Sequence, residues 1–273
     1  MNQWPQWVDY STIRPGEVGR DVFLVFDDNA GRNLCEARFN HPFLLMQQSD
    51  GRRNVGLGCC QMTVFNTAKN ISAANGTSVI RVGNVPLTLR DGHYETQDQI
   101  ETEINTQLQK KGGIGDIQFE TDHLGYVTLR GTNPLAIPLL HDGKYIPDHI
   151  GDKLGFHTPT SEDPVEIDGE PYMVIQPGSQ AVSCGDLFGP VGECLLICDE
   201  CIYTPETQRV ITTAALASYP ARSQICCHPE LRYRPLHDAP TLHKLTLRLV
   251  DRVSRSLNFV SGTPSATIDI KCL

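Results

Sequence analysis

Residues 91–108, "DGHYETQDQIETEINTQL", decide the predicted fold class, because they carry the clearest helix signal in a sequence otherwise built of short strands and turns. Thr96 is expected to be the N-cap, and Gln99 three residues later completes a capping-box pattern. The spacing predicts one apolar stripe on an amphipathic helix, made of Ile100, Ile104 and Leu108. Gly112 and Gly113 are expected to end the helix.

The segments around this helix predict a compact unit of mixed structure. The strand "VPLTLR" (85–90) leads into the helix. After it, "IQFETDHLGYVTLRG" (117–131) alternates apolar and polar residues on both sides of a turn, which predicts a hairpin. "IGDKLGF" (150–156) predicts a single helical turn that closes at Gly155.

The rest of the chain reads as antiparallel strands with one apolar face. "DVFLVF" (21–26) and "NVGLGCCQMTVFN" (54–66) are early strand candidates. The C-terminal part alternates most regularly, as expected for strands packed on one face. Its predicted inward positions are Leu245, Leu247, Leu249, Leu257, Phe259, Ala266, Ile268, Ile270 and Cys272.

These patterns predict a mainly β fold: a jelly-roll-like antiparallel β-sandwich with an inserted strand–helix–hairpin (α+β) subdomain. The expected parts are N-terminal sandwich strands at 1–84, the inserted subdomain at 85–156, and an acidic loop with the C-terminal sandwich strands at 157–273. Early and late strands are then expected to pair across the insertion, as Greek-key and jelly-roll topologies require.

Charge and hydropathy exclude several classes of protein. The net charge of −9 argues against direct nucleic-acid binding, which needs a basic footprint. No apolar run approaches the roughly 18 residues of a membrane helix. Residues 154–208 are acidic and residues 231–255 are basic. This pattern favours solvated loops and a charged strand face, and it is also compatible with oppositely charged segments that mate between neighbouring subunits.

The ten cysteines offer one metal-site hypothesis. The start of the chain has no secretory signal, so the cysteines are expected to be thiols rather than disulfides. "CDEC" has C-x-x-C spacing, and a second cysteine pair follows, which together are compatible with a zinc site. The candidate ligands are Cys198, Cys201, Cys226, Cys227 and His228. Apolar, strand-like surroundings favour ordinary buried thiols instead, and the adjacent pair is expected to point to opposite faces of a strand.

Enzyme motifs are absent from the sequence. It contains no G-x-S-x-G elbow, H-E-x-x-H helix, Walker A loop or G-x-G-x-x-G turn. The chain is therefore expected not to be an enzyme, with no catalytic residues and no cofactor.

Two stretches resemble a known family. The succession from "LTLRDGHYETQDQIETEIN" through the hairpin to "IGDKLGF", within residues 85–156, is one. The C-terminal "LHKLTLRLVDRVSRSLNFVSGTPSATIDIK", within residues 241–271, is the other. Both resemble the penton or minor capsid proteins of polinton-like viruses, virophages and related eukaryotic double-stranded DNA viruses.

This resemblance implies a single jelly roll with an outward-facing insertion that assembles into pentamers at capsid vertices. Its expected partners are copies of itself and neighbouring capsid proteins, and its expected location is the virion, after assembly in the host cytoplasm or nucleus. Trp4 and Trp7, within residues 1–12, would suit an arm that threads beneath a neighbour.

Two other functions remain open. A β-sandwich fibre or tail component that binds a receptor or glycan would use the loops around residues 157–193. A zinc-stabilised cysteine-rich protein would use the candidate ligands above. Assembly state distinguishes the capsid protein from the fibre or tail component. Bound zinc distinguishes the cysteine-rich protein from both.

Overall fold

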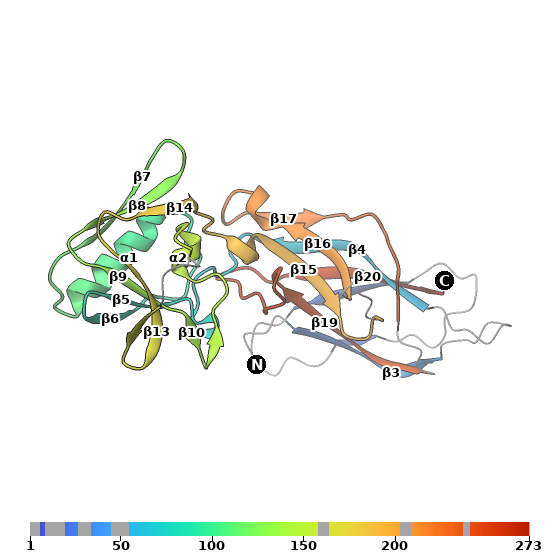
Figure 1. Ribbon diagram of the computed structural model, residues 1–273. Coiled ribbons are helices and arrows are strands. Elements are labelled where there is room, and N and C mark those ends of the chain that lie inside the picture. The colour runs from blue at the N-terminus through green and yellow to red at the C-terminus, as the bar shows by residue number, and fades with distance from the viewer. Residues whose placement is uncertain are drawn as a thin grey trace. The chain divides into compact units, whose positions relative to one another are not determined.

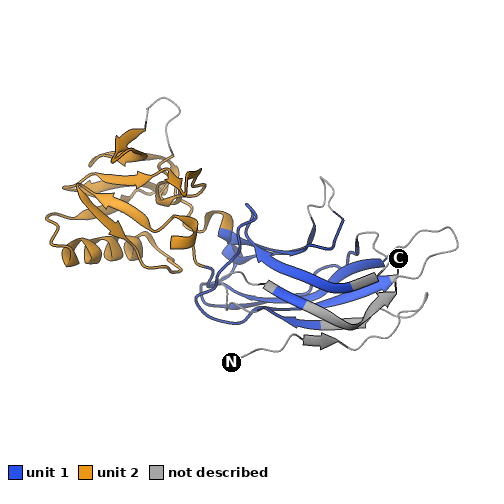
Figure 2. Ribbon diagram, turned by 90° about the horizontal axis from the view of Figure 1, so that it is seen from below, with its two compact units in different colours: residues 1–68, 191–273 blue, residues 69–190 orange. Residues whose placement is uncertain are grey.

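The computed structural model describes residues 6–8, 20–26, 34–44, 55–157, 164–202, 209–236 and 241–272. The chain divides into two compact units, shown in Figure 2. The sandwich unit consists of residues 1–68 and 191–273, and the inserted unit consists of residues 69–190.

The sandwich unit contains two sheets whose strands come from both ends of the chain (Figure 1). One sheet has the order β1 (Gln6–Val8), β3 (Leu34–Leu44), β19 (Thr241–Val250), β15 (Glu193–Cys198) and β16 (Val210–Ala215). The other has the order β17 (Gln224–Cys227), β4 (Val55–Phe65), β20 (Ser265–Cys272) and β2 (Arg20–Val25), and β18 (Arg234–Pro235) also pairs with β4. All these pairs are antiparallel except β1 with β3.

The strand order is that of an eight-stranded jelly roll. Without the short strands β1 and β18, one sheet reads β2-β20-β4-β17 and the other reads β3-β19-β15-β16. The last strand of the chain therefore lies between the first and the third of the eight, which gives the interleaved Greek keys of this fold. The mainly β, jelly-roll-like fold class is confirmed, as is the pairing of early with late strands across the insertion.

The predicted alternation fills one core between the two sheets. Leu245, Leu247 and Leu249 of β19 are fully buried, and so are Ala266, Ile268 and Ile270 of β20. Leu257 and Phe259 are also buried, but they lie in the loop after β19, where only isolated bridges form. The strand expected there is wrong, although both side chains reach the core as predicted.

A β-bulge explains why β4 does not alternate strictly. Cys59 and Met62, three residues apart, are both buried in the sandwich core. The register against β20 shifts between Ile268, opposite Cys59, and Thr267, opposite Gln61. One extra residue in β4 therefore keeps both side chains on the inner face.

The inserted unit has its own sheets, helices and core. Its larger sheet has the order β12 (Val165–Ile167), β13 (Glu170–Ile175), β9 (Leu135–Pro138), β5 (Val79–Val82) and β6 (Val85–Thr88). A three-stranded sheet has the order β14 (Gln180–Cys184), β8 (Tyr126–Gly131) and β7 (Ile117–Thr121). The remaining elements are the hairpin β10 (Leu140–His141) and β11 (Lys144–Tyr145), the helices α1 (Gln97–Lys110) and α2 (Ile150–Lys153), and the 3₁₀ turns η1 (Ala73–Asn75), η2 (Gly189–Gly192) and η3 (Leu216–Ser218), the last in the sandwich unit.

The structure confirms the helix predicted from residues 91–108. Thr96 is the N-cap, and its Oγ1 accepts the backbone N–H of Gln99 at 3.3 Å. Oε1 of Gln99 accepts the backbone N–H of Glu95, whereas the capping-box pattern predicts the N–H of Thr96, one residue later. Ile100, Ile104 and Leu108 are all buried in the core of this unit.

An ion pair between a buried carboxylate and an exposed guanidinium fixes α1 to the chain just after β6. Glu103 lies on α1 with 5% of its side chain exposed. Its Oε2 is 2.8 Å from Nη2 of Arg90, and its Oε1 accepts a bond of 2.8 Å from Gln107. Hydrogen bonds from Arg90 lower the pKa of Glu103 to about 2.

The inserted unit is larger than the 85–156 segment expected from the sequence. It begins before β5, because β5 pairs with β6 and β9, and it extends past β14, because β13 and β14 complete its two sheets. These flanking strands have the same half-buried pattern as sandwich strands, so their assignment depends on long-range pairing that the sequence does not display.

Candidate functional site

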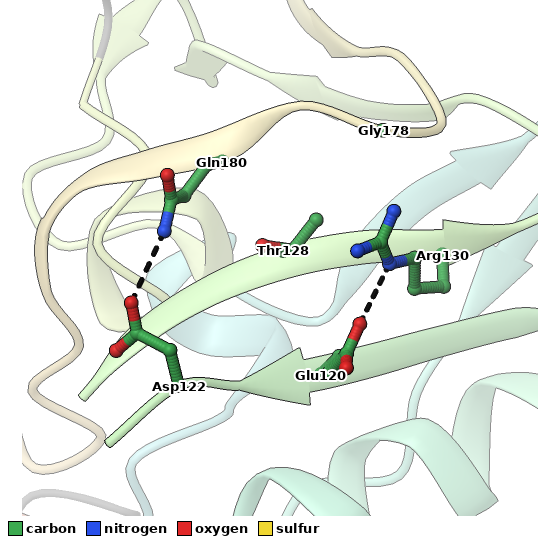
Figure 3. A pocket seen from close by; sticks show the side chains of 6 residues that line it. All are labelled: Glu120, Asp122, Thr128, Arg130, Gly178 and Gln180. Carbon is green, nitrogen blue, oxygen red and sulfur yellow. Dashed lines mark hydrogen bonds and ion pairs between the residues drawn. The ribbon is translucent and has the colours of Figure 1, made fainter. Parts of the chain in front are cut away.

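A polar hollow lies on the outer face of the three-stranded sheet of the inserted unit (Figure 3). Its volume is about 350 Å³. Residues of β7, β8 and β14 line it, together with residues of the turns after β7 and before β14. In β8 the alternation sends Val127 and Leu129 into the core and leaves Thr128 on the opposite face. The lining residues are Glu120, Asp122, Thr128, Arg130, Gly178 and Gln180.

Two contacts order the charged groups of this hollow. Arg130 Nε donates to Glu120 Oε2 at 2.7 Å, and Gln180 Nε2 donates to Asp122 Oδ2 at 3.2 Å (Figure 3). Asp122 Oδ1 accepts the backbone N–H groups of Leu124 and Tyr126. Hydrogen bonding, first from Tyr126, lowers the pKa of Asp122. The hollow thus presents carboxylate, guanidinium, amide and hydroxyl groups suited to hydrogen-bonding a small polar ligand.

The structure separates the cysteines that were candidate zinc ligands. Cys198 and Cys201 are fully buried at the end of β15, where a thiol–thiol hydrogen bond and burial raise the pKa of Cys198. Cys226 lies on β17 in the other sheet, is exposed, and accepts a bond from Gln61 Nε2 at 3.1 Å. Cys227 is half-buried, and burial followed by the charge of Cys226 raises its pKa.

Cys226 and Cys227 thus point to opposite faces of β17, as expected, and His228 is exposed just beyond them. The nine cysteines whose side chains are described are free thiols. Within the described ranges, no group of three or more His, Cys, Asp or Glu side chains is placed to hold a metal ion.

The two residues inside "CDEC" form a structural turn. Asp199 Oδ1 accepts a bond of 2.5 Å from Arg248, and Glu200 Oε2 accepts the backbone N–H of Thr246 at 2.7 Å. Both partners lie on β19, so the turn after β15 is fastened to its neighbouring strand. The two acidic residues between Cys198 and Cys201 therefore have a structural role of their own.

The basic segment 231–255 is largely neutralised within the chain. Arg232, Lys244, Arg248 and Arg255 pair respectively with Glu230, Glu36, Asp199 and Asp251. The expectation that this segment mates with the acidic segment of a neighbouring subunit is therefore weakened, because these charges already have partners.

The N-terminal arm lies mostly outside the described residues. Within it, residues 6–8 form β1, which pairs in parallel with β3 of the same chain. Among the described helices, none has the length and apolar character needed to cross a membrane.

Comparisons with known proteins give structural matches alone. No protein-family model and no curated protein matches the chain. Similar solved structures include the crystal structure of the mavirus penton protein, with 11% identity and a TM-score of 0.41 over 94% of this chain and 99% of that chain. They also include a chain of the cryo-EM structure of the Sputnik virophage, with 10% identity and a TM-score of 0.36 over 93% of this chain and 97% of that chain.

Proposed function

We propose that this chain is a structural protein of a virus particle, a minor capsid or penton protein that forms homo-oligomers, with the pentamer favoured. The observation that carries the proposal is the insertion of a complete α+β unit, residues 69–190, into the single connection between β4 and β15 of a jelly roll. Jelly rolls build viral capsid proteins, as well as lectins and cupins. The insertion matches the architecture that the sequence resemblance implies.

The edge of the sandwich supports assembly. β2 is the last strand of its sheet, so one side of its backbone has no neighbouring strand in the described chain. Phe23 on this strand is 62% exposed. An edge strand that carries a large exposed apolar side chain is protected when subunits pack against it. Neighbouring capsid proteins are the expected partners, and the virion is the expected location.

The solution mass of the purified full chain tests the proposal. Light scattering is expected to give a five-fold multiple of 30.2 kDa. A three-fold multiple would favour a fibre or trimeric capsid component, and a monomer at capsid-like concentrations would refute homo-oligomer assembly. Phe23→Asp is expected to lower the mass without unfolding the sandwich. Leu124→Asp is the matched control, since Leu124 is also 62% exposed but lies in the inserted unit.

A receptor- or glycan-binding component is the second candidate, and the polar hollow favours it. Gly178 and Gln180 belong to the 157–193 segment expected to carry recognition, and both line the hollow. Titration of the ¹⁵N-labelled chain with a panel of monosaccharides tests this function. Shifts confined to β7, β8 and β14 that vanish in Gln180→Ala would support it, and unchanged spectra would exclude it.

Zinc stabilisation is tested on the same sample. Metal analysis that finds one zinc per chain would establish the cysteine-rich alternative, in which Cys198 and Cys201 are the candidate ligands that lie together. A chain without zinc leaves these residues as buried thiols.

A further inference from the structure

Three side chains of the inserted unit form a hydrogen-bonded chain outside the hollow. Oγ of Ser183 lies 2.7 Å from Nε2 of His157. Nδ1 of the same ring lies 2.9 Å from Oδ1 of Asp152. A carboxylate can only accept a hydrogen bond, so Nδ1 carries the proton of the neutral ring and Nε2 accepts the hydroxyl proton of Ser183. This is the order of groups in which an imidazole activates a hydroxyl.

The backbone brings these three residues together from separate elements. Asp152 lies on α2, His157 follows the turn after α2, and Ser183 lies on β14. The carbonyl of Gly155 accepts the N–H groups of Val182 and Ser183 at 3.2 and 3.3 Å, which joins the turn to β14. Gly155 has φ +84°, and a Cβ there would lie 2.1 Å from the carbonyl oxygen of Ser183. The close approach of the turn to β14 therefore depends on glycine.

A buried histidine lies beside the carboxylate. Nδ1 of His149 accepts the backbone N–H of Asp152 at 3.2 Å, so a neutral ring carries its proton on Nε2. That Nε2 lies 3.5 Å from Oδ2 of Asp152. Burial lowers the pKa of His149, which keeps the ring neutral. The ammonium of Lys153 is held by Asp148 at 2.6 Å. Oδ2 of Asp152 thus faces the neutral ring of His149, and Oδ1 faces the ring of His157.

Exposure increases from the carboxylate to the imidazole. The side chain of Asp152 is 23% exposed, and that of His157 is 51% exposed. Ser183 is partly exposed as well. A small reagent can therefore reach the hydroxyl from solvent, while the group that orients the ring stays shielded.

We propose that Ser183 is a nucleophile activated by His157 and oriented by Asp152, and that it accepts acyl groups from small activated esters. Oγ of Ser183 forms a bond to the acyl carbon while its proton moves to Nε2 of His157. The bond to the leaving alcohol breaks, and the alcohol departs with that proton. Water then attacks the acyl-serine, gives a proton to Nε2, and releases the carboxylic acid as that proton returns to Oγ.

General-base assistance of this kind contributes about 10²- to 10⁴-fold to a rate. The proposal concerns the inserted unit alone, and it stands or falls independently of assembly. Such a triad is recognised by its geometry rather than by sequence order, so it is compatible with the absence of a G-x-S-x-G elbow.

Labelling of the full chain with a fluorophosphonate, located by mass spectrometry, tests the proposal. Ser183 is expected to react about 10²-fold faster than Ser179, a partly exposed serine on the turn before β14. After the exposed thiols of Cys184 and Cys226 are blocked by alkylation, the chain is expected to release a burst of one nitrophenolate per chain from p-nitrophenyl acetate. Ser183→Ala should abolish both signals, and Ser179→Ala should change neither.

His157→Gln keeps the serine and removes the base, so it tests the activation of Ser183 even if Ser183→Ala folds poorly. It is expected to lower labelling of Ser183 to the rate of Ser179, and Asp152→Asn should lower it as well. Hydrogen exchange of β14 in each variant checks that the strand stays folded. Labelling of Ser183 no faster than Ser179, or an unchanged rate in a folded His157→Gln chain, would overturn the proposal.

Discussion

Glu103→Gln tests whether the ion pair between the buried carboxylate on α1 and Arg90 stabilises the inserted unit. Lowering the pKa of Glu103 from 4.5 to about 2 corresponds to about 3 kcal/mol of stability at neutral pH, at about 1.4 kcal/mol per pH unit. The side chain of Arg90 is 74% exposed, so water and salt screen part of this energy. We therefore expect the variant to lose about 2 kcal/mol at pH 7.

Hydrogen–deuterium exchange of the amides of α1 is the appropriate assay, because both tryptophans lie in the N-terminal segment of the sandwich unit and their fluorescence would not report on this helix. A loss of about 2 kcal/mol corresponds to exchange about 30-fold faster. The amides of β19 serve as an internal reference in the other unit. Glu170→Gln is the matched control, since Glu170 is an exposed carboxylate of the inserted unit.

The pH dependence gives the sign of the effect. The pKa of Glu103 is lower in the folded chain than in the unfolded chain, so its contribution is fully present above about pH 4.5 and is lost as the pH falls toward about 2. The difference between the native chain and Glu103→Gln should shrink over that range. A variant that exchanges as slowly as the native chain at pH 7, or a difference that does not change with pH, would refute the reasoning.

Three further predictions concern other parts of the chain. Asp148→Asn removes the carboxylate that lies 2.6 Å from the fully buried ammonium of Lys153 and should destabilise the inserted unit by about 3–5 kcal/mol, measured by urea unfolding followed by hydrogen exchange. Cys226 should react with iodoacetamide in the folded chain, and Cys198 should react only after unfolding, whether or not a zinc chelator is present. If a chelator made Cys198 reactive in the folded chain, the buried-thiol interpretation would be wrong. Gly155→Ala should sharply lower the yield of folded protein, because of its φ and the clash with β14, and a normally stable variant would show that the turn can move.

The sequence predicted the elements whose determinants are local. The N-cap at Thr96 and the stripe that ends at Leu108 specify α1 within a few turns of chain, and both were found as expected. The alternation of β19 and β20 likewise identified the inner face of the sandwich. A capping hydrogen bond and a two-residue period depend on neighbouring residues, so they can be read without knowing the rest of the fold.

The predictions that failed depend on distant partners. The strands β5 and β14 have ordinary half-buried patterns, and only their pairing assigns them to the inserted unit rather than to the sandwich. Leu257 and Phe259 alternate correctly but find core contacts from a loop, so burial alone did not make a strand.

The candidate sites show the same limit. The C-x-x-C spacing is compatible with metal ligation, but it does not reveal the bonds from Asp199 and Glu200 to β19 that hold the turn. The hollow and the chain of hydrogen bonds from Ser183 to Asp152 both join residues of β14 or the turn before it to residues at least 26 positions earlier. No local motif marks these residues, and the three-dimensional arrangement was needed to find them.

The interleaved strand order has a consequence for synthesis on the ribosome. β2, β3 and β4 leave the exit tunnel first, yet their neighbours β19 and β20 lie at the far end of the chain. All of residues 69–190 must be translated before β15 can appear, which takes on the order of ten seconds at about 5–20 residues per second. The inserted unit is continuous, so it can fold during this interval, while the early strands expose apolar faces with nothing to cover them. The nascent jelly roll is therefore the part of this protein that most needs a chaperone.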